Sequence, residues 1–408
     1  MLAAIVATAG GHVAPVADAP LSVTRLASPA AAGSAQPQLS ASSRGLLLSW
    51  IEKTGTRATL KFAERTASGW SSARTVASGE DWFVNWADVP SVIRLRDGTL
   101  VAHWLQKSAA DTYAYDVKLS RSIDDGKTWS ASFTPHHDGT KTEHGFASLF
   151  EMPGGGLGLV WLDGRAMLPH ADGHSTGAMS LRSATFDAAW KQTSETLVDD
   201  RVCECCPTTA VVTADGPIVA FRNRDQDEVR DIHVSRFENG RWTASKAVHQ
   251  DGWKIPACPV NGPALNANGR DVAIAWFTVA NGQGRAFAAF SRDAGRTFGS
   301  PVRLDEAGSL GRVDVELLAN GSALATWIEF ADQRAQFRAR LVHPSGAASQ
   351  AVTIAGLEGS RASGYPRIAR HDDDIVFAWT ASSEGELRVE TAVARLGSSS
   401  DLALRPAR

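Results

Sequence analysis

Four cysteines are the residues whose type and spacing most directly suggest chemistry. Cys203, Cys205 and Cys206 form the compact segment C-E-C-C, and Cys258 lies further along in the segment W-K-I-P-A-C. Soft thiolates select copper(I), so this segment with a fourth cysteine nearby could hold copper by two or three sulfurs. Zinc fits less well, because the usual C-x2-C spacing is absent, although four thiolates could suit it.

Two other hypotheses for the cysteines stay open. A disulfide, for instance between Cys203 and Cys258, would be favoured in an oxidising compartment, where cysteines are often paired. Alternatively, Cys205 or Cys206 could be a reactive thiol activated by nearby arginines. The disulfide and metal hypotheses can coexist.

Charged residues gather in two further segments. W-L-D-G-R contains Asp163 and Arg165, and F-R-N-R contains Arg222 and Arg224. Arginines can grip a carboxylate or another anion bidentately. The alternative is that these side chains form internal Arg–Asp pairs with no role in binding.

Seven similar fifteen-residue segments surround these residues and must position them. Each contains a short apolar strand, a Gly/Asn/Asp turn and a more apolar strand closed by an aromatic residue, which is a hairpin signal. The segments are QPQLSASSRGLLLSW, PSVIRLRDGTLVAHW, ASLFEMPGGGLGLVW, PTTAVVTADGPIVAF, GPALNANGRDVAIAW, VDVELLANGSALATW and YPRIARHDDDIVFAW. Their aromatic ends are 51 to 60 residues apart, which leaves room for two more strands per unit. The sequence therefore predicts an all-β, seven-bladed β-propeller of four-stranded antiparallel blades.

The last unit lacks a clear fourth strand. The segment Leu21–Ala27 resembles the fourth strands of other units, so we expect it to close the ring by pairing with the last blade. Residues 20–408 are then one propeller domain, and residues 1–19 are a leader segment.

The repeat predicts which residues share a face. The loop before each segment and the loop after each aromatic lie at the same end of the propeller, which usually carries the site. Cys203 and Cys258 occupy the same register position on neighbouring blades. Other candidates at this channel mouth are Glu143 and His144, which could complete a mixed metal site, and Asn85, Trp86, Asn261, Arg312, Arg361 and Tyr365. Glu52 and Glu329 also fall here, and we expect them to be solvated, because loops are polar by default.

Composition bounds the function. The net charge of −3 gives no basic field to attract nucleic acid or anionic membranes. The sequence has no apolar run of about 18 to 20 residues, so we expect no transmembrane segment. Met1–Ala19 is rich in Ala and Val and ends in A-D-A, which resembles a secretory signal. We therefore expect a periplasmic or secreted protein.

Two turns share one pattern, S-x-D-x-G-x-[ST]-[WF]. They span Ser122–Trp129 and Ser291–Phe298, and Ser235–Trp242 is a degenerate copy. This pattern resembles the Asp-box, or BNR repeat, of the sialidase-like β-propellers. The resemblance implies that the turns are structural and lie on the face away from the active site. That superfamily includes exo-sialidases, other glycan-active propellers and non-enzymatic binding propellers.

The resemblance also implies what a sialidase of this type would need. It would need an arginine trio for the substrate carboxylate, a Tyr–Glu nucleophile pair and an aspartate acid/base. Tyr365 is the tyrosine predicted at the mouth, Asp163 could be the acid, and the trio could come from a set of five arginines: Arg165, Arg222, Arg224, Arg312 and Arg361. The chain departs from the sialidases, which have six blades and an F-R-I-P element and no C-E-C-C cluster. It also resembles a bacterial exported group with the segments R-V-C-x-C-C and W-K-I-P-x-C-P-V-N-G.

These observations give one leading hypothesis and two alternatives. The first is an extracytoplasmic propeller with a cysteine-based site for a metal, with copper favoured, or for thiol redox chemistry. The second is an exo-sialidase-type glycoside hydrolase. The third is a non-enzymatic binding or assembly propeller braced by disulfides. The expected partner is a small molecule, glycan or metal at the channel mouth, with a further protein on the rim as an option.

Overall fold

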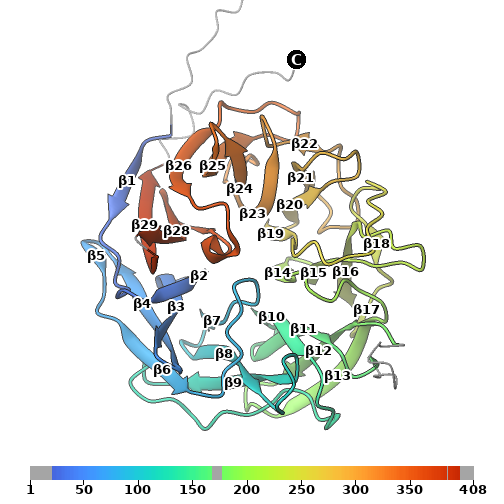
Figure 1. Ribbon diagram of the computed structural model, residues 1–408. Coiled ribbons are helices and arrows are strands. Elements are labelled where there is room, and N and C mark those ends of the chain that lie inside the picture. Colours follow the sequence, from blue (N-terminus) through green and yellow to red (C-terminus); the bar gives the residue numbers. More distant parts are fainter. Residues whose placement is uncertain (1–20, 168–176, 384, 396–408) are drawn as a thin grey trace, which may run out of the picture.

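The chain forms a ring of seven β-sheets around a central channel, as Figure 1 shows for the computed structural model. The structure describes residues 21–167, 177–383 and 385–395. The expected leader, residues 1–19, lies outside the described residues. The predicted seven-bladed β-propeller of antiparallel blades is confirmed.

Every blade begins with an inner strand and continues outward through antiparallel neighbours. The first three blades contain the strands β2 (Ser34–Ser42), β3 (Gly45–Thr54), β4 (Arg57–Thr66), β5 (Gly69–Trp70) and β6 (Arg74–Gly79); β7 (Ser91–Arg94), β8 (Leu100–Lys107) and β9 (Tyr115–Ser122); and β10 (His144–Glu151), β11 (Leu157–Asp163), β12 (Ser180–Phe186) and β13 (Gln192–Asp199).

The next three blades follow the same order. They contain β14 (Thr209–Thr213), β15 (Gly216–Arg222), β16 (Ile232–Glu238), β17 (Arg241–Trp242) and β18 (Lys246–Ala247); β19 (Ala264–Asn268), β20 (Asp271–Thr278), β21 (Arg285–Ser291) and β22 (Val302–Arg303); and β23 (Ser309–Leu317), β24 (Ala323–Ala331), β25 (Arg334–Val342) and β26 (Val352–Leu357).

The seventh blade is built from both ends of the described chain. It contains β27 (Arg367–His371), β28 (Asp374–Ser383), β29 (Glu386–Arg395) and β1 (Val23–Leu26), and it follows the short 3-10 helix η1 (Arg361–Ser363). β1 pairs antiparallel with β29, from Val23 opposite Ala394 to Leu26 opposite Thr391. This blade therefore takes its outer strand from the N-terminal segment.

The closing aromatics of the repeat form the core between blades. Trp50, Trp161, Trp276, Trp327 and Trp379 are among the largest fully buried side chains. They lie on the second strands of their blades, where apolar residues from both sheet faces pack against neighbouring blades. Burial of five indoles, each removing about 150–250 Å² from water, makes this repeat position a main source of stability.

The second blade departs from the four-stranded pattern. Its sheet has three strands, β7, β8 and β9, and the segment after β9 contributes only two isolated bridges, between Leu119 and Phe133 and between Tyr115 and Glu143. The chain from residue 123 to residue 143 therefore runs along the outside of this blade without forming a strand.

The two S-x-D-x-G-x-T turns have the same geometry. In the first, Ser122 Oγ donates to Asp124 Oδ1 (2.7 Å), and Thr128 donates from its backbone N (2.9 Å) and its Oγ1 (2.7 Å) to the Asp124 carboxylate. The second turn repeats these bonds around Asp293 with the same three distances. Both turns follow third strands at the end of the ring opposite to the cysteines, as expected.

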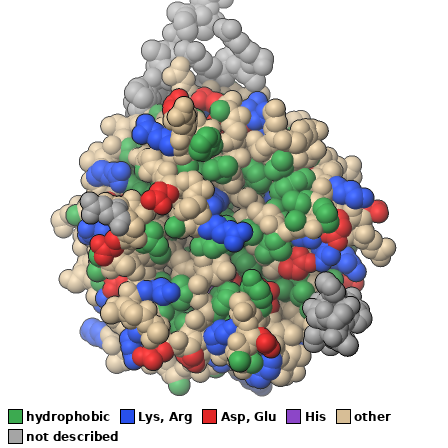
Figure 2. Space-filling model, viewed as in Figure 1, with side chains coloured by type: hydrophobic (Ala, Val, Ile, Leu, Met, Phe, Trp, Pro, Cys, Tyr) green, Lys and Arg blue, Asp and Glu red, His purple; other side chains and the backbone are tan. Residues whose placement is uncertain are grey.

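Charge is mixed over the face seen in Figure 2. Acidic and basic side chains lie near one another around its rim, and hydrophobic side chains lie between them. Among the described residues, no helix has the length and apolar character needed to cross a bilayer.

Candidate functional site

The C-E-C-C segment is a tight turn held against the fourth blade. Val202 forms a bridge with Asn223, and the Cys203 backbone N donates to the Arg222 carbonyl (3.0 Å). The chain then turns at residues 204 and 205, immediately before β14. This anchoring directs Cys203 and Cys206 into the protein, where both are buried, and leaves Cys205 half-buried.

The turn brings three sulfurs together. Cys203 Sγ lies 3.2 Å from Cys206 Sγ and 3.9 Å from Cys205 Sγ. The three sulfurs all lie within 4.8 Å of one another. Cys258, from the fifth blade, is exposed, and its thiol interacts with that of Cys205. All four cysteines are free, so neither the Cys203–Cys258 disulfide nor another pairing is present in this structure.

Donors and positive charge surround the buried sulfurs. Arg230 Nη1 donates to Cys203 Sγ (3.3 Å), and the Asn261 backbone N donates to Cys206 Sγ (3.4 Å). Burial alone would raise the pKa of Cys203, but hydrogen bonding with the Cys205 and Cys206 thiols and the charge of Arg222 hold that pKa well below its usual value. These contacts therefore favour the thiolate form of Cys203 over that of its neighbours.

The pKa values of the other three thiols also depend on their neighbours. Hydrogen bonding to Cys203 and Cys206 raises the pKa of Cys205, and burial together with the bond to Cys203 raises the pKa of Cys206. Hydrogen bonding from Cys205 lowers the pKa of Cys258. A thiol with a lowered pKa beside two further thiols is an arrangement that can bind a soft cation or take part in thiol–disulfide exchange.

Tyr365 lies at the mouth of the channel, but its side chain is buried. Its hydroxyl donates to the Val260 carbonyl (2.7 Å), and its ring stacks on Trp86 with 5.9 Å between ring centroids. Burial, with the nearby Cys206 sulfur, raises the pKa of Tyr365. A phenol that is enclosed and already donating is poorly suited to act as a nucleophile.

Val260 has φ +48°, which is strained for a β-branched residue, so the backbone next to the cysteines stores strain.

Arg222 is a structural brace between blades. It is 1% exposed, and it donates to three backbone carbonyls: Asn261 O (2.9 Å), Arg230 O (2.6 Å) and Phe277 O (2.7 Å). Its guanidinium also lies 4.8 Å from the centroid of the Trp253 ring. The F-R-N-R arginine at this position is therefore engaged within the protein.

Three of the other four candidate arginines are also engaged within the protein. Arg165 binds Asp163 through Nε and Nη2, both at 2.7 Å, and Arg224 binds Glu228, with Nη2 2.6 Å from Oε1. Arg312 donates to the Ser360 and Gly364 carbonyls (both 3.2 Å) and packs over Trp86, while Arg361 is exposed at the start of η1. Internal bracing therefore accounts for W-L-D-G-R, and Arg165, Arg224 and Arg312 share no hydrogen-bond partner with one another.

The expectation that Glu52 and Glu329 are solvated is wrong. Trp50 Nε1 donates to Glu52 Oε1 (2.8 Å), and Trp327 Nε1 donates to Glu329 Oε2 (2.9 Å). Trp161 makes the same bond to Asp163 Oδ2 (2.7 Å). The physical reason is the buried indole N–H, which needs an acceptor, and an acidic residue two positions later on the same strand face supplies it. The W-x-[DE] spacing was the sequence signal for this role.

A carboxyl–phenol–carboxyl group near the cysteine turn was missed in the sequence. Tyr115 is fully buried, and its hydroxyl donates to Glu143 Oε1 (2.6 Å) with Asp88 Oδ2 at 3.4 Å. Burial, with the charge of Glu143, raises the pKa of Asp88 to about 8. Burial, with the charge of Glu204, raises the pKa of Glu143 to about 7. No local motif joins these three positions, because they come from three separate segments.

His144 is grouped with carboxylates rather than with thiols. Its ring nitrogens belong to one cluster with Asp116 and His136 and to another with Asp138 and Asp163. The mixed thiol–imidazole site suggested by the sequence is therefore two groups of different donor type in this structure.

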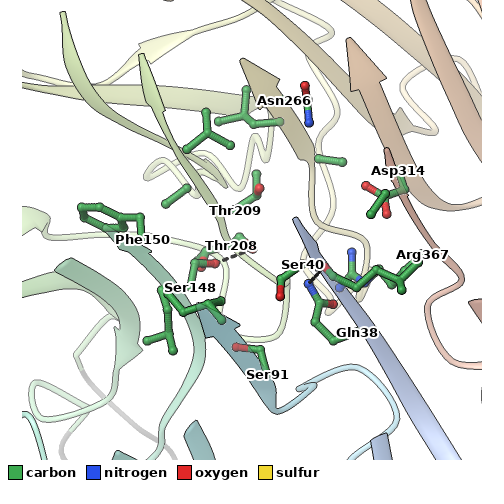
Figure 3. A pocket seen from close by; sticks show the side chains of 18 of the residues that line it. Gln38, Ser40, Ser91, Ser148, Phe150, Thr208, Thr209, Asn266, Asp314 and Arg367 are labelled. Atoms are coloured by element: carbon green, nitrogen blue, oxygen red, sulfur yellow. Dashed lines mark hydrogen bonds between the residues drawn. The ribbon is translucent and has the colours of Figure 1, made fainter. Parts of the chain in front are cut away.

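The central channel itself is a polar cavity of about 420 Å³ lined by all seven inner strands. Hydroxyls of Ser40, Ser91, Ser148, Thr208 and Thr209 face it from several blades, as Figure 3 shows. Asp314 from β23 and Arg367 from β27 also line it. The Trp86–Tyr365 stack, by its place before the inner strands, lies at the cysteine end of this channel.

Comparison with known proteins supports the fold alone. No protein-family model and no curated protein matches the sequence. A protein of unknown function from Dyadobacter fermentans is 13% identical, with a TM-score of 0.52, and the match covers 92% of this chain and 98% of that one. Polysaccharide lyase Uly1 is 9% identical, with a TM-score of 0.53, and the match covers 88% of this chain and 90% of that one.

Sialidases also occur among the similar structures. A mutant of NanB sialidase from Streptococcus pneumoniae is 9% identical, with a TM-score of 0.45, and the match covers 93% of this chain and 95% of that one. The β-propeller is confirmed as a fold, and activity has to be argued from the site.

Proposed function

We propose that this protein binds a soft metal ion, copper(I), through Cys203, Cys205 and Cys206 at the rim of the channel mouth, with Cys258 as a fourth thiol. The observation that carries the proposal is the convergence of three free sulfurs within 4.8 Å of one another. Metal–sulfur bonds of about 2.3 Å place the sulfurs of a trigonal or tetrahedral site about 4 Å apart. The 3.2 and 3.9 Å separations are close to that spacing.

Charge and donor type favour copper(I) over a divalent ion. Sulfur is a soft donor, and no imidazole or carboxylate shares a ligand group with these thiols among the described residues. A monovalent ion bound by two or three thiolates leaves a net negative charge. The guanidinium of Arg230, 3.3 Å from Cys203 Sγ, and that of Arg222 can balance this charge in a buried place.

The position of the thiols supports reversible loading. Cys203 and Cys206 are buried, whereas Cys205 is half-buried and Cys258 is exposed. An ion can therefore first meet the outer thiols and then reach the inner pair.

The test is a titration of copper(I) into the reduced protein in competition with a chromophoric chelator. We expect one ion per chain in the wild type, and affinity at least about 100-fold weaker in Cys205→Ser/Cys206→Ser, because two of three sulfurs are lost. Cys258→Ser should weaken binding less, since its thiol reaches the cluster only through Cys205. Equal affinity in the wild type and the double variant would contradict the proposal.

Thiol redox chemistry is the alternative with a specific observation in its favour. The 3.2 Å separation of Cys203 Sγ and Cys206 Sγ is short enough for these sulfurs to form a disulfide after a small movement. Thiol counting and mass spectrometry after mild oxidation distinguish the two functions. A Cys203–Cys206 disulfide in a protein that binds no copper(I) would favour the redox function.

A sialidase-type hydrolase has less support. Tyr365 is enclosed, and Arg165, Arg222, Arg224 and Arg312 are bonded at separate places. Release of a fluorogenic aglycone from a sialoside, compared between the wild type and Tyr365→Phe, tests it.

We also propose that the protein acts in the periplasm or is secreted. The A-D-A pattern in residues 17–19 supports this location. Fusion of the first 20 residues to a reporter enzyme that is active only outside the cytoplasm tests it, and an inactive fusion would contradict it.

A further inference from the structure

The segment from residue 123 to residue 143 is the longest stretch without a strand between consecutive strands of the described ring. It covers the one blade whose sheet has three strands. Long structureless connections in compact domains are uncommon and usually have a function. This segment carries His136 and Asp138 to the place where β9 and β10 lie side by side.

Two imidazoles stack at this place. The rings of His136 and His144 have centroids 3.9 Å apart and planes 10° apart. His144 is 0% exposed and His136 is 5% exposed. Despite this burial, His136 Nε2 and both ring nitrogens of His144 make no hydrogen bond with the described residues. Buried polar atoms without a partner are rare in proteins, and an unseen ion is one of the few explanations for them.

Carboxylates flank the stacked rings on two sides. Asp138 Oδ2 lies 3.2 Å from His136 Nδ1 and 3.2 Å from His144 Nε2. On the other side, Asp116 Oδ1 lies 3.6 Å from His144 Nδ1 and 4.0 Å from His136 Nε2. Each ring therefore has one nitrogen near Asp138 (His136 Nδ1 and His144 Nε2) and the other nitrogen near Asp116 (His136 Nε2 and His144 Nδ1).

This division matches the way proteins hold metal-binding histidines. A carboxylate behind the ring accepts from one nitrogen, fixes the tautomer and directs the lone pair of the other nitrogen to the ion. Asp138 occupies this position behind His136, with which it shares a hydrogen bond at Nδ1, and its Oδ2 also lies 3.2 Å from His144 Nε2 without a hydrogen bond in this structure. Asp116 Oδ1, His136 Nε2 and His144 Nδ1 then form a set of three donors, with the oxygen 4.0 and 3.6 Å from the two nitrogens, and one ligand atom of each residue lies within 4.8 Å of the others.

We propose that Asp116, His136 and His144 bind a divalent first-row transition ion, with Zn²⁺ the best fit, and that Asp138 orients the two imidazoles. Metal–nitrogen and metal–oxygen bonds of about 2.0–2.2 Å place neighbouring donors about 3.0–3.5 Å apart. The nitrogen–oxygen distances of 3.6 and 4.0 Å require only a small inward movement. The side chain of Asp116 is 17% exposed and gives the ion a path from solvent.

The nearby cations do not occupy this place. Arg165 is bound to Asp163, Asp138 and Glu195, and it therefore lies on the side of the rings away from Asp116. Lys118 Nζ is 3.9 Å from the other oxygen of Asp116. Asp116 Oδ1 thus keeps its contacts with the two imidazoles.

The bound ion would fasten the long segment to the ring. His136 comes from that segment, Asp116 from β9 and His144 from β10. Three ligands from three parts of the chain would join the second and third blades where the second blade lacks a fourth strand. This site is independent of the thiol cluster, because its donors are nitrogen and oxygen and come from other blades.

The test is the binding of Zn²⁺ to protein first dialysed against a chelator, in the Cys205→Ser/Cys206→Ser background so that the thiol cluster contributes little. We expect one Zn²⁺ per chain by calorimetry and a higher melting temperature with excess Zn²⁺, because an ion that binds only the folded state stabilises it. With Co²⁺ as a probe, the absorption bands should lack thiolate-to-metal charge transfer.

Variants separate this site from general effects on folding. His136→Gln should abolish the binding and the thermal shift, whereas His137→Gln, at the exposed adjacent histidine, should leave both unchanged. Asp138→Asn should weaken Zn²⁺ binding about 10- to 100-fold, as expected for an orienting carboxylate. If His144→Gln fails to fold, the partly exposed Asp116, as Asp116→Asn, provides the same test. The absence of Zn²⁺ binding in the folded parent protein, or equal binding in His136→Gln, would overturn the proposal.

Discussion

The two ends of the propeller are built in different ways. At the end opposite to the cysteines, two turns from different blades repeat the same bonds around Asp124 and Asp293 with the same distances. At the cysteine end, thiols, stacked imidazoles and strained backbone differ from blade to blade. The repeat therefore forms complete local hydrogen-bond sets at one end. The candidate sites lie at the cysteine end, where the residues differ from blade to blade.

The largest expected effect contrasts an arginine from each end. Arg222→Ala should lower the free energy of unfolding by about 4 kcal/mol, because three buried carbonyls lose their donor and the Cys203 thiolate loses a counter-charge. Arg296→Ala, at the opposite end, removes the ion pairs of an exposed arginine with Asp215 and Glu238. This substitution should change the free energy of unfolding little. Urea unfolding measures both, and similar losses would remove the contrast between the ends.

The second effect is on the pH dependence of stability. Burial lowers the pKa of His103 to about 4, so between pH 6.5 and 4 the unfolded chain binds a proton that the folded chain does not. Stability should therefore fall by up to about 3 kcal/mol as the pH falls through this window. His103→Gln should flatten that dependence in unfolding curves at several pH values. An unchanged slope would assign the acid sensitivity to other groups.

The smallest expected effect tests the equivalence of the two turns. Asp124→Ala and Asp293→Ala should lower the melting temperature by the same amount, because the carboxylates accept the same bonds. Those bonds lower the pKa of each aspartate to about 2 despite the opposing effect of desolvation, so their contribution is present above about pH 4 and is lost as the pH falls toward 2. Thermal melts by circular dichroism compare them, and unequal shifts would show that the surrounding blade also matters.

The fold could be predicted from the sequence because its signals are local and repeated. Each blade carries its own hairpin and closing aromatic, so seven weak signals support one another. The register argument also placed Cys203 and Cys258 at the same end of the ring. The Asp124 and Asp293 turns were predicted for the same reason, since all of their bonds lie within eight residues.

The roles of the charged residues could not be predicted in the same way. Arg222 ends up among carbonyls up to 55 residues away, and Tyr115 meets Glu143 and Asp88 only after two blades pack together. Glu52 and Glu329 had a local signal, the tryptophan two residues earlier, but the general polarity of loops outweighed it. Side-chain partners that come from packing are fixed by tertiary structure and leave no spacing pattern.

The pairing of β1 with β29 sets an order of events during synthesis on the ribosome. Thr391 donates to the Leu26 carbonyl across 365 residues of sequence. At a translation rate of about 5–20 residues per second, β1 waits roughly 20–70 s for its partner strand to be made. During that time six blades can form while the ring stays open and β1 has no neighbour. Closure of the ring therefore has to wait until β29 has been made, and a nascent chain at this stage offers chaperones a long opportunity to bind.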